Sequence, residues 1–193
     1  MPQPQEKQYS YADLLEWNEN IRYELYDGLP VALASPSSAH QMISGELFSQ
    51  FYTFLKGKEC RVFSAPLDVR LFEKKGDSLD SVSTVVQPDL MVVCDKSKID
   101  RYGISGAPDL IVEIASDSTR RIDRLTKFNL YQRAGVREYW IVDPVNRTAA
   151  VYTLEEGAYH GAETYGPDAV VPVGVLEDCR IDLSDVFPEV RRT

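Results

Sequence analysis

The stretch Pro108-Asp109-Leu110-Ile111-Val112-Glu113-Ile114-Ala115 places the carboxylate of Glu113 in the middle of an apolar run. A second stretch, Val85-Val86-Gln87-Pro88-Asp89-Leu90-Met91-Val92-Val93, carries Asp89 among similar neighbours. Both runs are apolar on both faces, which indicates interior strands of a sheet covered by helices on each side. A carboxylate on such a strand is costly unless a cation, a proton or a hydrogen-bond donor compensates it. A divalent metal ion is the simplest partner for two converging carboxylates.

Period-two alternation divides the strand around Glu113 into two faces. One face carries Glu113 with Asp109, Ile111 and Ala115, and the other carries Leu110, Val112 and Ile114. Asp109 is a rival to Asp89 because Pro108-Asp109 repeats Pro88-Asp89. Its position four residues before Glu113 separates the two acids by roughly 13 Å, too far for one metal ion. We therefore interpret Asp109 as a residue that begins the strand.

The first third of the chain carries clear signals of local structure. Asp27-Gly28 lies between two alternating runs, 21–26 and 29–33, and predicts a β-hairpin. Ser10-Tyr11-Ala12-Asp13 predicts a short helix that ends near Trp17. Ser38-Ala39-His40-Gln41 predicts the start of a longer helix that ends near Gly57, with Gln41 in the capping-box position. The expected apolar stripe of that helix consists of Met42, Ile43, Leu47, Phe51, Phe54 and Leu55.

The remaining elements are predicted from shorter patterns. Strands are expected over 60–63, 67–72, 138–142 and 148–154, with weak strands near 170–175. Helices are expected over about 120–134, ending at Gly135, and near 183–187. The polar segment 73–81 indicates a mobile loop. This order predicts an α/β or α+β protein with a central mixed β-sheet, helices on both faces and an N-terminal β-hairpin.

Length and composition indicate a globular protein. The 193 residues, 44% hydrophobic and 26% charged, fit a single domain over residues 1–193. No apolar stretch approaches the length of a membrane span, and residues 1–8 lack the order of a signal peptide, so we expect a cytoplasmic protein. Cys60, Cys94 and Cys179 are far apart and without CxxC spacing. We expect neither a disulfide nor a zinc site, but small buried side chains.

The charge distribution leaves two interpretations open. A net charge of -9 argues against a protein whose whole surface binds nucleic acid. Basic residues nevertheless crowd one segment, at Arg120, Arg121, Arg124, Lys127, Arg133 and Arg137, against the acids Asp117, Asp123 and Glu138. This segment is either a local basic face or a solvated helix with i,i+4 pairs such as Asp123 with Lys127.

Asp89, Glu113 and Lys127 together suit phosphodiester hydrolysis. The carboxylates could hold Mg²⁺, and an ammonium could stabilise charge on the phosphate or orient the attacking water. Two of these residues also have a structural interpretation: Asp89 could begin a strand, and Lys127 could be a solvated helix charge. Glu113 is harder to explain in this way, because it lies in mid-strand with apolar neighbours on both sides. Tyr139-Trp140 is more typical of a core than of a surface that stacks on bases.

The ordered set of these short motifs resembles a known family. Pro88-Asp89 followed by Glu113 on the next core strand resembles the PD-(D/E)xK nuclease superfamily. More narrowly, the stretch from Tyr23 to Asp143, which is most of the chain, is similar to its bacterial Uma-type endonuclease family. The matching pieces are Tyr23-Glu24-Leu25-Tyr26-Asp27-Gly28, Ser35-Pro36 with His40, Ala65-Pro66-Leu67-Asp68-Val69, Val86-Gln87-Pro88-Asp89, Gly106-Ala107-Pro108-Asp109-Leu110-Ile111-Val112-Glu113, Asp123 with Lys127 and Tyr131, and Ala134-Gly135-Val136-Arg137-Glu138-Tyr139-Trp140-Ile141-Val142-Asp143.

The resemblance implies a restriction-endonuclease-like fold and a site with assigned roles. It implies Asp89, Glu113 and the Ile114 carbonyl as ligands of Mg²⁺, with Mn²⁺ as a substitute. Lys127 becomes the catalytic base or stabiliser, because Ala115 stands where the superfamily has its lysine. Glu24 is implied as an outer carboxylate and His40 as a contact to phosphate or water.

DNA is the substrate that this resemblance implies, and a homodimer without membrane attachment is the expected state. Two other functions stay open: a non-catalytic binding module that keeps the nuclease fold and acts as a partner protein, and hydrolysis of another phosphate ester. The acidic composition and the absent in-strand lysine favour the binding module.

Overall fold

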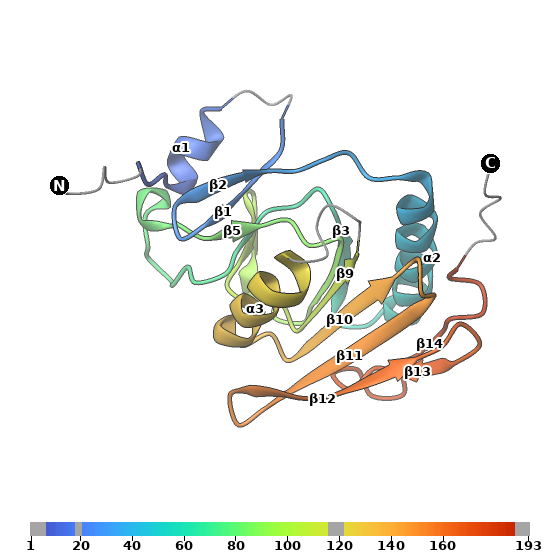
Figure 1. Cartoon of the computed structure of the whole chain (residues 1–193). Coiled ribbons are helices and arrows are strands. Elements are labelled where there is room, and N and C mark those ends of the chain that lie inside the picture. The colour runs from blue at the N-terminus through green and yellow to red at the C-terminus, as the bar shows by residue number, and fades with distance from the viewer. Residues whose placement is uncertain (1–6, 18–20, 116–121, 188–193) are drawn as a thin grey trace.

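The computed structural model describes residues 7–17, 21–115 and 122–187, with the backbone alone for 122–124. Its strands form two six-stranded sheets and one two-stranded sheet (Figure 1). The first sheet has the order β2 (Leu29–Ala32), β1 (Tyr23–Tyr26), β5 (Val85–Val86), β4 (Val69–Arg70), β8 (Gly103–Ser105) and β7 (Ile99–Asp100). The second has the order β12 (Ala158–Tyr165), β11 (Thr148–Glu155), β10 (Glu138–Asp143), β9 (Leu110–Ile114), β6 (Leu90–Val93) and β3 (Arg61–Ser64).

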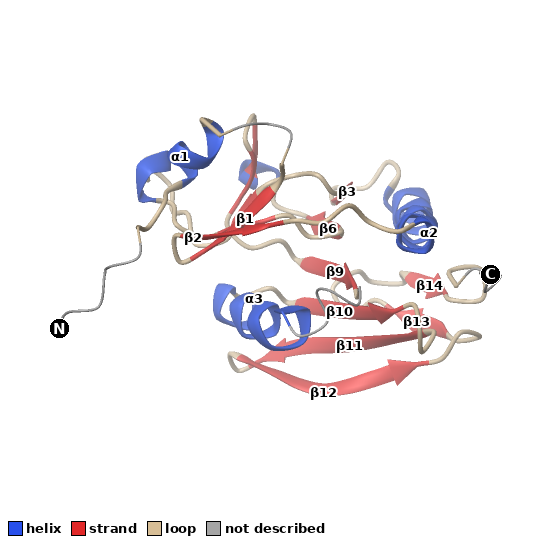
Figure 2. Ribbon diagram, turned by 45° about the horizontal axis from the view of Figure 1, so that its top comes forward, coloured by secondary structure: helices blue, strands red, loops and turns tan. Residues whose placement is uncertain are grey.

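The second sheet is mixed, as expected. β9 pairs with β10 in parallel and with β6 antiparallel, and both β9 and β6 are interior strands. β9 to β12 lie side by side in Figure 2. The small third sheet pairs β13 (Val170–Pro172) with β14 (Arg180–Asp182).

The apolar run 85–93 belongs to both large sheets. Its first part is β5 in the first sheet, and its last part is β6 in the second. Gln87-Pro88-Asp89 lies between them, where the chain passes from one sheet to the other. Proline lacks the N–H that an interior strand must donate, so Pro88 interrupts the ladder. The site acid Asp89 therefore lies at the junction of two sheets.

Helices cover both faces of the second sheet, as the sequence predicts. α2 (Ser38–Leu55) packs on the face that includes Leu110, Val112 and Ile114. α3 (Phe128–Ala134) packs through Leu130 and Tyr131 on the opposite face, with Ile111 and Ala115. The predicted alternation along β9 is confirmed, because the two sets of residues belong to two separate core clusters.

The N-terminal elements form where local chemistry predicts them. Asp27 and Gly28 both have positive φ, 48° and 84°, which is the requirement of a two-residue hairpin turn between β1 and β2. Helix α1 (Tyr11–Leu15) begins with a complete capping box, in which Ser10 and Asp13 bond each other's backbone N–H.

The start and stripe of α2 differ from the prediction in two details. The N-cap is Ser37, whose side chain accepts from the His40 backbone N–H, so Gln41 is not in the capping-box position. Met42 is 58% exposed, whereas Ile43, Leu47, Phe51 and Leu55 are buried. Of two adjacent serines either can cap a helix, and only the approach of the preceding chain selects one.

Several short elements depart from the sequence patterns. The strand expected over 67–72 is reduced to β4, and segment 73–81 contains a 3₁₀ turn, Leu79–Ser81. The helix expected over 120–134 begins, within the described residues, as a π-helical turn, Ile122–Lys127, before α3. Gly135 ends α3 with φ 86°, as predicted. The structure has turns at 183–187 instead of a helix, and β12 was missed because its exposed polar residues show no alternation.

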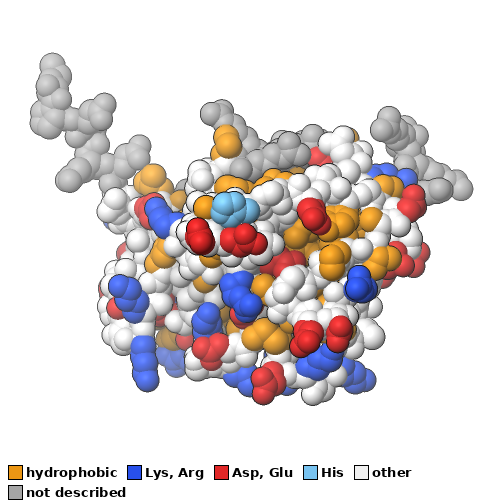
Figure 3. Space-filling view, turned by 90° about the horizontal axis from the view of Figure 1, so that it is seen from below, with side chains coloured by type: hydrophobic (Ala, Val, Ile, Leu, Met, Phe, Trp, Pro, Cys, Tyr) orange, Lys and Arg blue, Asp and Glu red, His pale blue; other side chains and the backbone are white. Residues whose placement is uncertain are grey.

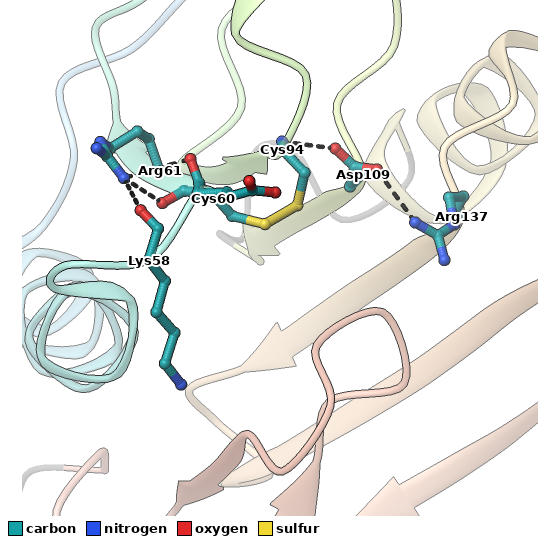
Figure 4. Close-up of a disulfide and its surroundings, with 7 residues drawn as sticks. Lys58, Cys60, Arg61, Cys94, Asp109 and Arg137 are labelled. Atoms are coloured by element: carbon teal, nitrogen blue, oxygen red, sulfur yellow. Dashed lines mark hydrogen bonds and ion pairs between the residues drawn. A yellow bond between two sulfur atoms is a disulfide. The ribbon is translucent and has the colours of Figure 1, made fainter.

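Cys60 and Cys94 form a disulfide, so the expectation that they are unlinked side chains was wrong (Figure 4). β3 and β6 pair with Arg61 opposite Val93, and continuing this register by one residue sets Cys60 opposite Cys94. The spacing of the cysteines in the sequence does not reveal this disulfide, because the two residues become neighbours only when β3 pairs with β6. The cross-link closes a loop, 34 residues in sequence separation, that contains Asp89. Cys179 is buried and free, as expected.

The side chain of Glu138, on β10, forms a hydrogen bond that links the second sheet to the segment between β13 and β14. This side chain is fully buried, and its Oε1 accepts from Trp140 Nε1 at 2.6 Å while its Oε2 accepts from the Val175 backbone N–H at 2.8 Å. Burial raises the pKa of Glu138 above the usual 4.5, and these hydrogen bonds oppose part of that rise.

Glu138→Gln should gain stability relative to the wild type as the pH rises above 4.5. Because the folded-state pKa of Glu138 exceeds its unfolded-state value, its contribution to stability is fully present below the unfolded pKa and is lost as pH rises through the folded pKa. Glutamine does not titrate, and its weaker contact with Val175 adds a cost that is independent of pH. Urea denaturation of both proteins over a pH series measures the difference. A difference that stays flat with pH contradicts this account.

Candidate active site

Lys127 lies buried between two carboxylates. Its Nζ is 2.9 Å from Glu113 Oε1 and 3.2 Å from Glu24 Oε1. The Lys127 side chain is 7% exposed, and those of Glu113 and Glu24 are 4% and 2% exposed. The alternative that Lys127 is a solvated helix charge is therefore wrong. Buried charges are tolerated where they pair and receive further hydrogen bonds, as these do.

The three residues come from three different elements. Glu24 lies on β1 of the first sheet, and Glu113 lies on β9 of the second. Lys127 is the last residue of the π-helical turn that precedes α3, and π-helical turns are frequent at functional sites. The Gln87 backbone N–H, at the crossing between the sheets, donates to Glu24 Oε1 at 2.8 Å. The site thus forms where the two sheets meet.

Two tyrosines hold the carboxylates on either side of Lys127. Tyr131 donates its hydroxyl to Glu113 Oε1 at 2.6 Å, and Tyr26 donates to Glu24 Oε2 at 2.6 Å. Burial, with the nearby carboxylates, raises the pKa of Tyr131 well above 10.0 and also raises that of Tyr26. Both hydroxyls therefore remain hydrogen-bond donors at any working pH.

Asp89 lies opposite Glu113 on the same face of the sheet. β6 and β9 pair with Leu90 opposite Val112, and continuing that register by one residue sets Asp89 opposite Glu113. Met91 and Ile111 are also paired and belong to one core cluster. Asp89 is two residues from Met91, and Glu113 is two residues from Ile111, so both acids face the same side as that pair. Facing side chains on antiparallel strands lie within about 5.5 Å at their Cβ atoms.

The backbone of Ile114 faces Asp89 as well. Its N–H donates to Asp89 Oδ2 at 2.7 Å, while the next N–H, that of Ala115, donates to Val142 on the other side. In an extended strand the N–H and C=O of one residue point to the same side. The carbonyl of Ile114 is therefore directed toward Asp89.

His40 approaches Asp89 from the first turn of α2. Its Nε2 is 3.0 Å from Asp89 Oδ2, and the two side chains are 14% and 18% exposed. His40 Nδ1 is buried and, within the part of the chain that the structure describes, has no hydrogen-bond partner. The backbone N–H of His40 donates to the Ser37 side chain, so the N-cap of α2 holds the residue from which the imidazole reaches Asp89.

The oxygen groups of this site are of the chemical kind that Mg²⁺ prefers, whereas structural zinc sites are built mainly from Cys and His. Residues 7–17, 21–115 and 122–187 contain no group of three or more His, Cys, Asp or Glu side chains that could hold a metal ion. A zinc cage of four protein ligands is therefore not formed among them. Magnesium usually keeps several waters and needs only one or two carboxylates. Asp89, Glu113 and the Ile114 carbonyl, the ligands that the family resemblance implies, are oxygen groups of this kind.

The basic segment is only partly described. Arg133 pairs with Asp27 at 3.3 Å, and Arg137 pairs with Asp109 at 3.2 Å, all four as side-chain contacts. Asp117, Arg120 and Arg121 lie outside the described residues, as do the side chains of Asp123 and Arg124. Acidic and basic groups are interspersed on the face shown in Figure 3. The choice between a basic face and a solvated helix therefore stays open.

The remaining residues singled out in the sequence have structural roles. Asp109 accepts from the Cys94 backbone N–H at 2.8 Å, which agrees with a residue that begins a strand (Figure 4). Tyr139 and Trp140 are fully buried core residues, as expected. Among the described residues, no helix combines the length and apolarity that a membrane span requires.

Sequence reasoning assigned no role to Tyr26, Tyr131 or Gln87. The spacing of the two tyrosines could have indicated their roles. Tyr26 is two residues after Glu24 on a strand, so the two side chains lie on the same face. Tyr131 is four residues after Lys127 along a helix, so these two side chains are also neighbours. Gln87 acts partly through its backbone, for which the sequence contains no signal.

Comparison with known proteins agrees with this architecture. A crystal structure titled as that of "a putative nuclease belonging to DUF820" from Anabaena variabilis superposes with a TM-score of 0.72, over 92% of this chain and 97% of that chain, at 22% identity. It supports the restriction-endonuclease-like fold. "Uncharacterized protein slr1290" from Synechocystis sp. is 30% identical over 124 residues, which are 63% of this chain and 61% of that protein. The Uma2 family, described as "Putative restriction endonuclease", matches residues 10–184. This chain therefore belongs to the Uma2 family.

Proposed function

We propose that this protein is a Mg²⁺-dependent endonuclease that hydrolyses phosphodiester bonds of DNA. The observation that carries the proposal is the buried Lys127 between Glu24 and Glu113, with Asp89 set opposite Glu113 by the strand register. Membership of the Uma2 family and the nuclease-like fold support the reaction class.

Asp89, Glu113 and the Ile114 carbonyl would hold the ion. When bound, Mg²⁺ would polarise a phosphoryl oxygen and make an attacking water more acidic. Glu113 lies on β9 and Asp89 directly precedes the adjacent strand β6, and the Ile114 N–H already orients the Asp89 carboxylate. Mn²⁺ accepts the same oxygen ligands and is the expected substitute.

Lys127 suits the stabilisation of charge better than the removal of a proton. Its Nζ lies 2.9 Å from Glu113 Oε1 and 3.2 Å from Glu24 Oε1, so both of these neighbours are groups to which it donates. Lys127 Nζ contacts Glu113, one of the proposed metal ligands. A phosphate bound next to Glu113 would therefore lie near this ammonium, which would stabilise the charge on its non-bridging oxygens. Glu24 would hold Lys127 in place from the other side, as the outer carboxylate.

His40 would contact the phosphate or a water molecule at the partly exposed edge of the site. Its Nε2 faces Asp89, and its buried Nδ1 is a further polar atom for a ligand to satisfy. DNA is the proposed substrate. A homodimer is the proposed assembly, because cutting both strands of a duplex is simplest with two sites.

Isothermal titration of the protein with MgCl₂ and with MnCl₂ tests the metal site directly. The wild type should release or absorb heat on binding, and Asp89→Asn and Glu113→Gln should each abolish that heat, because each removes a charged oxygen ligand. Asp109→Asn is the matched control, because Asp109 follows a proline in the same way but bonds the Cys94 backbone. Equal heats in Asp89→Asn and in the wild type would reject the proposed ligand set.

One observation favours the alternative of a non-catalytic binding module. Arg133 and Arg137, the described exposed arginines of the basic segment, are paired with acids rather than directed to a phosphate backbone. A binding module predicts no heat of metal binding that depends on Asp89 and Glu113. The same titration therefore separates the two functions.

A further inference from the structure

We propose, building on the nuclease function above, that Tyr131 and Tyr26 are positioning residues with different tasks. Tyr131 orients Glu113 for the metal ion, and Tyr26 orients Glu24 so that Lys127 is held in place. The observation is that each tyrosine hydroxyl donates, at 2.6 Å, to a different one of the two carboxylates that flank Lys127.

The backbone places each tyrosine beside its partner. Glu24 and Tyr26 are two residues apart on β1 and share one face of the strand. Tyr131 lies one helical turn after Lys127, so both side chains lie on the same side of the helix, toward Glu113. Each pair therefore forms a rigid unit on a regular element, which is the setting in which a second layer of hydrogen bonds orients a functional group best.

Tyr131 acts on the metal-ligand side of the site. Its hydroxyl and Lys127 Nζ contact the same oxygen, Glu113 Oε1, from two directions. Two donors on one oxygen fix the rotation of the carboxylate about its last bond. The Tyr131 ring is itself held by an edge contact with the buried Tyr139, with centroids 5.1 Å apart. Hydrogen-bond partners of a metal ligand typically contribute about 10- to 100-fold to metal affinity.

Tyr26 acts on the lysine side. Glu24 Oε2 accepts from Tyr26, and Glu24 Oε1 accepts from the Gln87 backbone N–H at 2.8 Å and lies 3.2 Å from Lys127 Nζ. Both oxygens of Glu24 are thus engaged with groups of the protein. Removing the Tyr26 hydroxyl would loosen Glu24 and its hold on Lys127, while Asp89 keeps its bond from the Ile114 N–H and Glu113 keeps its bond from the Tyr131 hydroxyl.

Three single variants of the full chain test this division, each of which removes one hydroxyl and keeps the ring. Tyr131→Phe should weaken Mn²⁺ binding, measured by isothermal titration, by about 10- to 100-fold. Tyr26→Phe should bind Mn²⁺ as the wild type does but nick supercoiled plasmid DNA with a lower kcat and an unchanged KM. Tyr159→Phe is the matched control, because Tyr159 belongs to the same aromatic cluster but donates to the Val136 carbonyl. It should leave both quantities unchanged.

The outcomes separate this proposal from the function on which it rests. No heat of Mn²⁺ binding in the wild type would overturn both. Heat in the wild type that depends on Asp89, together with an equal affinity in Tyr131→Phe, would overturn the positioning role alone. Equal losses in all three variants would indicate a general loss of packing and would likewise overturn it. Thermal unfolding of each variant shows whether the fold is retained.

Discussion

Asp89→Asn should lower the rate of Mg²⁺-dependent plasmid nicking by at least about a hundredfold, which corresponds to about 3 kcal/mol of lost stabilisation of the transition state. Asparagine keeps the shape of the side chain and can still accept the Ile114 N–H, which bonds Asp89 Oδ2 at 2.7 Å. What it removes is the negative charge that would hold the metal ion opposite Glu113. The measurement is the initial rate of conversion of supercoiled plasmid to nicked circles.

Asp109→Asn is the control for this experiment. Asp109 also follows a proline at the start of an interior strand, but its carboxylate bonds the Cys94 N–H and Arg137. It should nick at close to the wild-type rate. Loss of activity in both variants, or in neither, would contradict the assignment of Asp89, rather than Asp109, as a metal ligand.

Lys127→Met should lower the free energy of unfolding by about 3 to 5 kcal/mol and also abolish nicking, because it leaves Glu24 and Glu113 buried without their shared cation. Methionine fills a similar volume, so the loss reports charge rather than a cavity. Urea denaturation monitored by circular dichroism gives the stability. The comparison variant is Arg133→Met, which breaks the exposed pair with Asp27. Such surface pairs contribute about 0 to 1 kcal/mol.

A third variant distinguishes charge from shape at this position. Combining Lys127→Met with Glu24→Gln and Glu113→Gln removes all three charges together. It should recover much of the lost stability while remaining inactive, because a neutral buried network carries no uncompensated charge. If the triple variant is as unstable as Lys127→Met alone, the cost arises from packing and not from the charge of the two carboxylates.

Much of the fold could be predicted because its signals are local. The turn at Asp27-Gly28, the capping box at Ser10 and the end of α3 at Gly135 each depend on the backbone preferences of a few adjacent residues. The two faces of β9 follow from alternation alone. β12 could not be found in this way, because an exposed edge strand has no buried face to impose a pattern on its sequence.

The sequence by itself placed Glu113 on an interior strand and Asp89 beside one, because the aliphatic runs around them are apolar on both faces; in the structure Glu113 lies on β9, and Asp89 directly precedes β6. Only the tertiary structure decided which groups meet. Continuing the β6 and β9 register sets Asp89 opposite Glu113, and the crossing of the chain at Gln87-Pro88 brings Glu24 from the other sheet against Lys127. The same holds for Cys60 with Cys94, and for the hydroxyls of Tyr26 and Tyr131 on their carboxylates. Most of these contacts join residues that are far apart in the sequence, and the others depend on how neighbouring elements pack. The register between strands is set by the whole fold, so no short segment of sequence reveals which residues will meet.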